Sequence, residues 1–285
     1  MKKFLKRVLV LVVLAVVLVS VCACNTVPAK RFMSNSMVKK LTNEFNGVQA
    51  EVTLSYEIRD GGVKKQFEIK IVYDLLVGQA PIAVTRFIQL ANDGYYNDSI
   101  IDTYNQTYRY MVMGRYLYKD SVVSENKQNY YANKTMPTFK GEFKSNNYSE
   151  PTGGYAQFES YSLAMYHEES KSDNANFDTA QGALILALDN TLNSNNYAVF
   201  AHMYSTTYTV IDGDNVTSVE HIGKMHGMAE TNLKSFTATS RRTSVYTDAT
   251  EEHKLPSVTM MDQLVTVKVR ILGDYDWSKL PQIGR

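Results

Sequence analysis

Apolar and polar residues alternate with a period of two in three stretches of the chain, residues 52–58, 67–73 and 265–271. This period predicts β-strands with one buried face. The turn signal Arg59-Asp60-Gly61-Gly62 lies between the first two stretches, so we expect them to form a β-hairpin. The third stretch predicts a closing strand near the end of the chain.

A different period follows the predicted hairpin. Apolar residues recur every three or four positions between residues 81 and 91, which predicts an amphipathic helix. Pro81 suits the first turn of this helix, where a backbone N–H has no partner in any case. Gly94 suits the position just after its end. A shorter helix is predicted for residues 36–45.

The rest of the chain predicts short strands separated by polar stretches. Residues 115–135 and 235–256 are polar and are expected to be loop insertions. Because the sequence holds many short strands and few helices, we expect a mostly-β closed sheet, in which no strand edge is left open. Further strands are predicted at residues 108–113, 162–165, 183–188, 198–203 and, as a hairpin around Asp212-Gly213, 207–219.

The N-terminus has the order of a secretory signal, with four cations followed by the apolar run 8–19 and small residues. The run is too short for a comfortable spanning helix. Its end, Val21-Cys22-Ala23-Cys24, resembles a lipobox. We therefore expect cleavage before Cys24 and attachment of lipid, including palmitate, to that cysteine. A retained anchor or an ordinary secretory signal is the alternative.

These features predict the domain organisation and the location. The signal peptide is expected at residues 1–23, a tether at 24–46, a folded domain at 47–275 and a C-terminal tail at 276–285. Lipid on Cys24 would hold the protein on the cell membrane, at its extracytoplasmic face. Cys22 and Cys24 are the two cysteines of the sequence, so the mature protein is predicted to have no internal disulfide.

Charge and composition exclude some functions. The sequence has 30 Lys and Arg against 29 Asp and Glu. The signal holds four of the cations and no acid, so the mature part carries a net charge of about −3. Nucleic-acid binding is therefore not expected, because it needs a concentrated basic surface. None of the five histidines has the spacing of a metal site.

Several motifs, in order, resemble the cyclophilin family. They include a helix of the type A-P-x-x-V-x-x-F, then G-Y-Y-x-x-S-I, and later N-Y-A-V-F. The resemblance covers roughly residues 48–272, and its segments are residues 67–73, 80–87, 90–100, 137–143, 162–165, 178–186 and 196–200.

The resemblance implies an eight-stranded antiparallel barrel closed by two helices, here with loop insertions. It implies peptidyl-prolyl cis–trans isomerase activity on extended or proline-containing peptide segments, which for this protein would belong to exported proteins. No cofactor is implied. In that family an arginine near the prolyl nitrogen favours the twisted amide, and a hydrophobic pocket holds the proline ring.

The sequence departs from the family in the substrate groove. Thr103 stands where the resemblance places the catalytic arginine, and polar groups elsewhere in the groove are replaced by apolar or small residues. Arg109 or Arg115 could substitute for the missing arginine, or both could be surface cations. The groove positions implied by the resemblance are Thr103, Met111, Met113, Ala183, Leu184, Ile185, Leu192 and Tyr197.

Two functions follow as hypotheses. The first is a lipid-anchored isomerase of exported proteins with weak or lost activity, since slow X-Pro isomerisation limits folding. The second is a non-catalytic module that binds peptides or a protein partner at the cell surface.

Overall fold

The computed structural model describes residues 26–28, 31–60, 63–105, 107–119, 122–126, 138–167, 177–178, 180–238, 242–244, 259–261 and 264–283. The predicted signal peptide and Cys24 lie outside the described residues.

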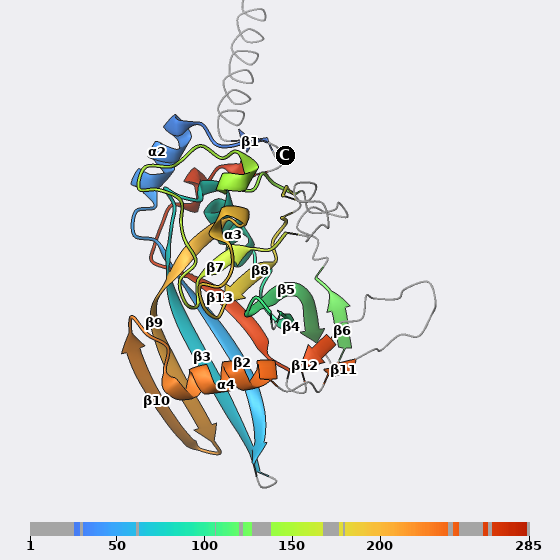
Figure 1. Cartoon of the computed structure of the whole chain (residues 1–285). Coiled ribbons are helices and arrows are strands. Elements are labelled where there is room, and N and C mark those ends of the chain that lie inside the picture. Colours follow the sequence, from blue (N-terminus) through green and yellow to red (C-terminus); the bar gives the residue numbers. More distant parts are fainter. Residues whose placement is uncertain are drawn as a thin grey trace, which may run out of the picture.

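Eight antiparallel strands form a closed ring (Figure 1). Their order around it is β9 (Val199–Asp212), β3 (Val63–Leu75), β2 (Gln49–Asp60), β13 (Thr266–Leu272), β4 (Ser99–Asn105), β5 (Tyr110–Lys119), β8 (Leu184–Ala187) and β7 (Leu163–Met165). The ring closes because β7 also pairs with β9. The predicted eight-stranded antiparallel barrel is thus confirmed.

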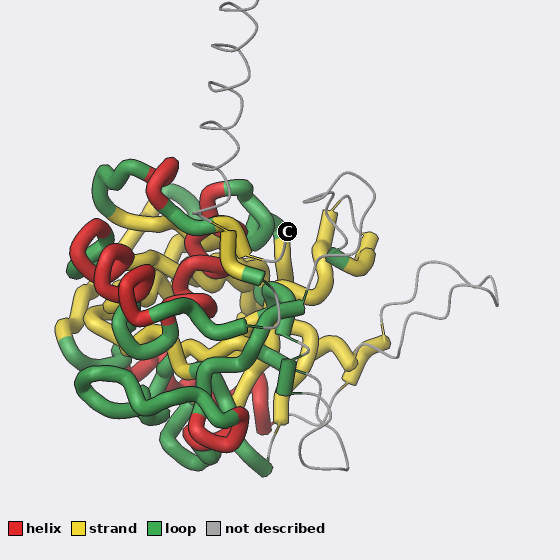
Figure 2. Tube along the Cα trace, turned by 90° about the horizontal axis from the view of Figure 1, so that it is seen from above, coloured by secondary structure: helices red, strands yellow, loops and turns green. Residues whose placement is uncertain are grey.

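Two further strands extend the ring. β10 (Asn215–Ile222) pairs with β9, and β6 (Val122–Glu125) pairs with β5. Two short strand pairs form sheets of their own: β1 (Thr26–Val27) with β14 (Gln282–Ile283), and β11 (Arg242–Ser244) with β12 (Thr259–Met261). In the view from above, helices and loops lie over the ends of the strands (Figure 2).

The three predicted alternating stretches lie in β2, β3 and β13, and β2 and β3 form the predicted hairpin. The predicted helix is α3 (Pro81–Asn92), and the shorter one is α2 (Asn35–Glu44). The hairpin predicted around Asp212-Gly213 is formed by β9 and β10.

Two predicted insertions contain regular structure. β5 continues to Lys119 and is followed by β6, so the prediction of a loop from residue 115 was wrong there. Tyr116 is buried in this extension, at 7 % exposure, whereas Leu117 and Tyr118 beside it are only partly buried, so the sequence shows no clear alternation here. Helix α4 (Gly227–Ala238) enters the segment predicted as a loop from residue 235.

Helices α3 and α4 lie towards opposite ends of the barrel, as the resemblance implies (Figure 1). From α4, Ala229 and Leu233 are fully buried in the core. Asn232 donates hydrogen bonds to the hydroxyls of Tyr56 and Tyr208, at 2.7 and 3.1 Å. These bonds hold α4 against β2 and β9.

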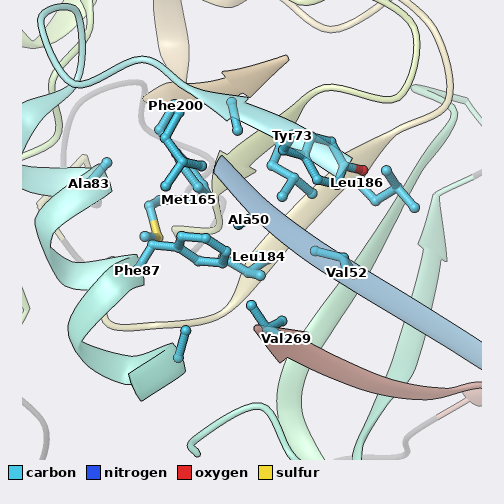
Figure 3. Packing of buried hydrophobic residues seen from close by; sticks show 14 of the residues in the cluster. Ala50, Val52, Tyr73, Ala83, Phe87, Met165, Leu184, Leu186, Phe200 and Val269 are labelled. Carbon is cyan, nitrogen blue, oxygen red and sulfur yellow. The ribbon is translucent and has the colours of Figure 1, made fainter. Parts of the chain in front are cut away.

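The barrel interior is filled by apolar side chains that point inward from the strands and from α3. Figure 3 shows Leu184 and Met165 beside Phe87 of α3, with Phe200 nearby. All four side chains are at most 1 % exposed. Burial of this size supplies the main stabilisation of a domain that has no disulfide in its described part.

A buried glutamate caps α3. Ala80 at the start of the helix provides no side-chain cap. Instead, Glu142 accepts hydrogen bonds from the backbone N–H groups of Ile82 and Ala83, at 2.8 and 2.9 Å. An acceptor here satisfies donors that the first helical turn leaves unpaired. Burial raises the pKa of Glu142 to about 8, and the two N–H donors oppose this shift.

Candidate functional site

A second apolar cluster lies on the outer face of the ring. Val112 of β5, Ile185 of β8 and Ala164 of β7 point away from the barrel interior and are fully buried. We call the whole set the outer cluster: Tyr110, Val112, Phe158, Ala164, Ala183, Ile185, Ala187, Leu192 and Val199, with Ala156, Tyr166 and Tyr197 packed against it.

Side chains from two loops cover the outer cluster. Phe158 comes from the loop before β7, and Leu192 from the loop after β8; they are 4 % and 5 % exposed. The backbone N–H of Phe158 donates to the hydroxyl of Ser194 at 2.8 Å, which ties the two loops together. The ring of Tyr197 meets that of Phe158 edge-on, with 5.9 Å between centroids. The outer face is therefore closed by the protein's own side chains.

The structure divides the predicted groove residues between two clusters. Ala183, Ile185 and Leu192 belong to the outer cluster, and Tyr197 packs against it. Thr103 lies on β4 beside an arginine.

Met111, Met113 and Leu184 lie instead in the barrel core. The motif resemblance placed these three residues in the groove, and the structure corrects this. Side chains alternate along β5 and β8, so these three point inward while Val112 and Ile185 point outward. Tyr110, Val112 and Phe158 are outer-cluster residues that the sequence analysis missed. For the two strand residues, the phase of the strand would have indicated the outward face.

An arginine does approach Thr103. Arg115 of β5 donates from its Nη2 to the Thr103 hydroxyl at 2.5 Å and from its Nε to Asp102 Oδ1 at 3.0 Å. Its Nη2 also forms an ion pair with Asp102. The guanidinium lies over the ring of Tyr166, 4.8 Å from its centroid. One of the two candidate substitute arginines is thus held next to the predicted arginine position.

Asp102 is the group that fixes Arg115. It is 1 % exposed, and its Oδ2 has no hydrogen-bond partner among the described residues. Burial raises the pKa of Asp102, and the hydrogen bond from Arg115 opposes this shift. The ion pair with Asp102 raises the pKa of Arg115 against the effect of burial, so the guanidinium stays cationic. The Arg115 side chain keeps 30 % of its surface exposed.

Arg109, the other candidate, forms an ion pair with Asp189. Its Nε lies 2.8 Å from Asp189 Oδ2, and its side chain is 43 % exposed. Its backbone has a φ of 50°. The pair with Asp189 supports the interpretation of Arg109 as a surface cation.

The model of the cyclophilin type peptidyl-prolyl cis-trans isomerase family matches residues 63–228. This match spans more than half of the chain. The protein belongs to the cyclophilin family.

Solved cyclophilins resemble the chain at low sequence identity. A cyclophilin type peptidyl-prolyl cis-trans isomerase of Cryptosporidium parvum, solved in the presence of the dipeptide Ala-Pro, is 12% identical with a TM-score of 0.39. The alignment covers 77% of this chain and 99% of that chain. The Mimivirus cyclophilin is 12% identical with a TM-score of 0.36, covering 80% of this chain and 92% of that chain. The search of curated proteins gave no match.

The described residues of this cyclophilin contain neither a three-residue metal site nor a membrane-spanning helix. Among the described residues, no group of three His, Cys, Asp or Glu side chains is arranged to hold a metal ion. No helix in the described part of the chain is both long and apolar enough to cross a membrane.

Proposed function

We propose that this protein is a lipid-anchored cyclophilin on the extracytoplasmic face of the cell membrane. It binds extended or proline-containing segments of exported proteins, and its isomerase activity is weak or lost. Family membership supports the substrate class. The signal-like N-terminus and the lipobox-like Val21-Cys22-Ala23-Cys24 support the location.

The burial of the outer cluster carries the proposal of weak or lost activity. A pocket for a proline ring needs apolar surface that is open to solvent, because substrate gains its binding energy by burying that surface. Here Val112, Ile185 and Ala164 are already fully buried. A proline ring could reach them after Phe158 and Leu192 had moved away, and that movement costs free energy.

The position of Arg115 bears on any activity that remains. A guanidinium catalyses this reaction when it donates to the prolyl nitrogen more strongly in the twisted amide than in the planar one. Arg115 already donates to Asp102 and Thr103. Because part of its surface is exposed, Arg115 retains the capacity to donate to a bound amide. Its guanidinium is nevertheless oriented towards Asp102, with which it forms the ion pair.

The test is a protease-coupled isomerisation assay on the mature chain, with an ordinary cyclophilin measured in parallel. We expect kcat/KM to be lower than that of the ordinary cyclophilin by at least about a hundredfold, which equals about 2.7 kcal/mol. Arg115→Lys should remove most of any residual turnover, and the matched surface variant Arg109→Lys should not. Turnover equal to that of the ordinary cyclophilin would overturn the proposal.

The anchor has its own test. Metabolic labelling with palmitate and mass spectrometry of the N-terminal peptide should show lipid on Cys24. Cys24→Ser should release the protein from the membrane fraction. An unmodified Cys24 in a membrane-free protein would contradict the location without touching the isomerase result.

A second candidate function is the non-catalytic binding module, and the free edge of β10 favours it. β10 pairs with β9 on one side, and no described strand pairs with its other side. Val216 and Ile222 are 63 % and 70 % exposed on this strand. A strand with an open edge can accept a strand from a partner. Loss of partner capture in a Ser218→Pro variant, with isomerase turnover unchanged, would support this function.

A further inference from the structure

The first described element starts very close to the proposed anchor. β1 begins at Thr26, two residues after Cys24. Two extended residues span at most about 7 Å. The link between the lipid and the first strand is therefore far shorter than the tether of residues 24–46 that the sequence pattern suggests.

β1 is fixed to the opposite end of the chain. It pairs in parallel with β14, with Thr26 opposite Gln282 and Val27 opposite Ile283. Val27 is 2 % exposed and Ile283 is 1 % exposed. This burial removes the freedom that a linker would need at this point.

β14 is in turn fixed to the barrel. Gln89 of α3 donates to the carbonyl oxygen of Pro281 at 2.7 Å, and the fully buried Arg86 donates to that of Ile283 at 3.4 Å. Trp277 stacks on Phe45, with 5.8 Å between ring centroids. Contacts thus run without a break from the inner core through α3 and β14 to Thr26.

The segment around β1 and α2 carries an excess of positive charge. Residues 24–44, to the end of α2, contain Lys30, Arg31, Lys39 and Lys40 and one acid, Glu44, which pairs with Lys279, although the mature chain is about −3 overall. The segment is therefore about +3, and the remainder of the mature chain is about −6. Arg31, Lys39 and Lys40 are exposed and make no ion pair with another described residue. A cation cluster beside a lipid anchor is attracted to anionic headgroups.

We infer that the end of the barrel carrying β1 and α2 lies against the membrane surface, with its exposed cations on anionic lipid headgroups. This inference rests on the proposed lipid anchor at Cys24. The short link sets the distance, and the charge sets the orientation. The β2–β3 and β9–β10 hairpins then point away from the membrane, since they lie at the other end of the molecule from β1 and α2 (Figure 1).

The orientation can be measured on the lipidated mature protein, from Cys24 onward, in vesicles. Once Cys24 carries lipid, a cysteine introduced into the mature chain is its one free thiol, so it can take a fluorescent label. Ser36→Cys labels α2 and Asp214→Cys labels the β9–β10 turn; both residues are exposed. The vesicles contain about a third phosphatidylglycerol and a lipid with a nitroxide on its headgroup.

We expect the nitroxide to quench the label at residue 36 at least several-fold more than the label at residue 214. Equal quenching of membrane-bound protein would overturn the inference and leave the anchor intact. Protein that stays out of the membrane fraction, like Cys24→Ser, would overturn both.

Two variants separate the short link from the charge. Twenty Gly and Ser residues inserted between Asn25 and Thr26 should reduce the difference between the two labels to less than about twofold in neutral vesicles. Lys39→Glu with Lys40→Glu should reduce it in anionic vesicles, with Lys64→Glu on the distant β3 as the control. A difference that neither variant changes would overturn the roles given to the link and the cations.

Discussion

The inner and outer faces of β5, β7 and β8 are both packed with apolar side chains, but different parts of the chain cover them. Helix α3 covers the inner face, and the buried side chain of Glu142 caps that helix. Loop residues such as Phe158 cover the outer face, and the pair of Asp102 and Arg115 lies at its edge. The family match identifies the fold, whose core is formed by the side chains on the inner face. The outer face carries a second layer of apolar packing, which includes Ala183, Ile185 and Leu192, three positions that the motif resemblance assigns to the substrate groove.

The largest test of this comparison truncates one buried residue on each face. Leu184→Ala empties a site in the inner core and Ile185→Ala one in the outer cluster. Both side chains are fully buried, so each change should cost about 2–5 kcal/mol of unfolding free energy in urea titrations. Val216→Ala, at an exposed site, should cost less than about 0.5 kcal/mol. A small loss at Ile185 alone would show that the outer face is open in solution.

A smaller effect is expected at the edge of the outer face. Arg115→Met leaves Asp102 buried without its cation. We expect a loss of about 2–3 kcal/mol, below the usual 3–5 kcal/mol for a buried pair because Arg115 is partly exposed. The control Arg109→Met, in an exposed pair, should cost less than about 1 kcal/mol.

The pH dependence of the stability loss in Arg115→Met tests whether the unpaired charge of Asp102 causes that loss. Its removal should raise the pKa of Asp102 further, so the loss should be greater at pH 8 than at pH 5, where protonation removes the unpaired charge. The double variant Asp102→Asn with Arg115→Met should recover most of the stability. A loss independent of pH would contradict the role of Asp102.

Glu142, which caps α3, predicts that the stability of the wild type depends on pH. Because the pKa of Glu142 is raised from 4.5 to about 8 on folding, its stabilising contribution to the free energy of unfolding is fully present below pH 4.5. It is lost as pH rises to about 8, by at most about 1.4 kcal/mol per pH unit. Glu142→Gln should flatten this decline, measured as Tm from pH 5 to 9. Identical slopes for the two proteins would rule out a raised pKa at Glu142.

The smallest effect is expected at the predicted arginine position. Thr103→Val removes the hydroxyl that accepts from Arg115, but the bonds from Arg115 to Asp102 remain. A loss of about 0.5–1.5 kcal/mol is expected by chemical denaturation. Thr217→Val, on the exposed edge strand, is the matched control. A much greater loss would mean that Thr103, rather than Asp102, holds the guanidinium in place.

Much of the fold could be predicted from the sequence, because its periodicity is local information. The alternation in residues 52–58 and 67–73 and the helical spacing after Pro81 each identify one element. The ring itself needed the family motifs, since strand order is not encoded in period alone. Tyr116 was missed because one buried residue in a polar stretch gives no detectable period.

The site was less predictable because it depends on which way each side chain points. Motif alignment placed Met111 and Met113 in the groove, whereas the strand phase turns them into the core. The contact between Arg115 and Thr103 joins two strands across an irregular pairing of β4 and β5. Phe158 lies in a loop whose apolar residues follow neither a helix nor a strand period, so the closure of the outer face follows from tertiary structure.

The place of β13 in the ring has a consequence for folding. β13 lies between β2 and β4, and Val267 pairs with Leu54, more than 200 residues earlier in the chain. Such distant pairing is slow because a long loop must close before any contact forms. A chain threaded through a membrane from its N-terminus would keep the edges of β2 and β4 unpaired until almost all of it had crossed. If the protein is exported as proposed, the ring can therefore close only after almost all of the chain has crossed the membrane.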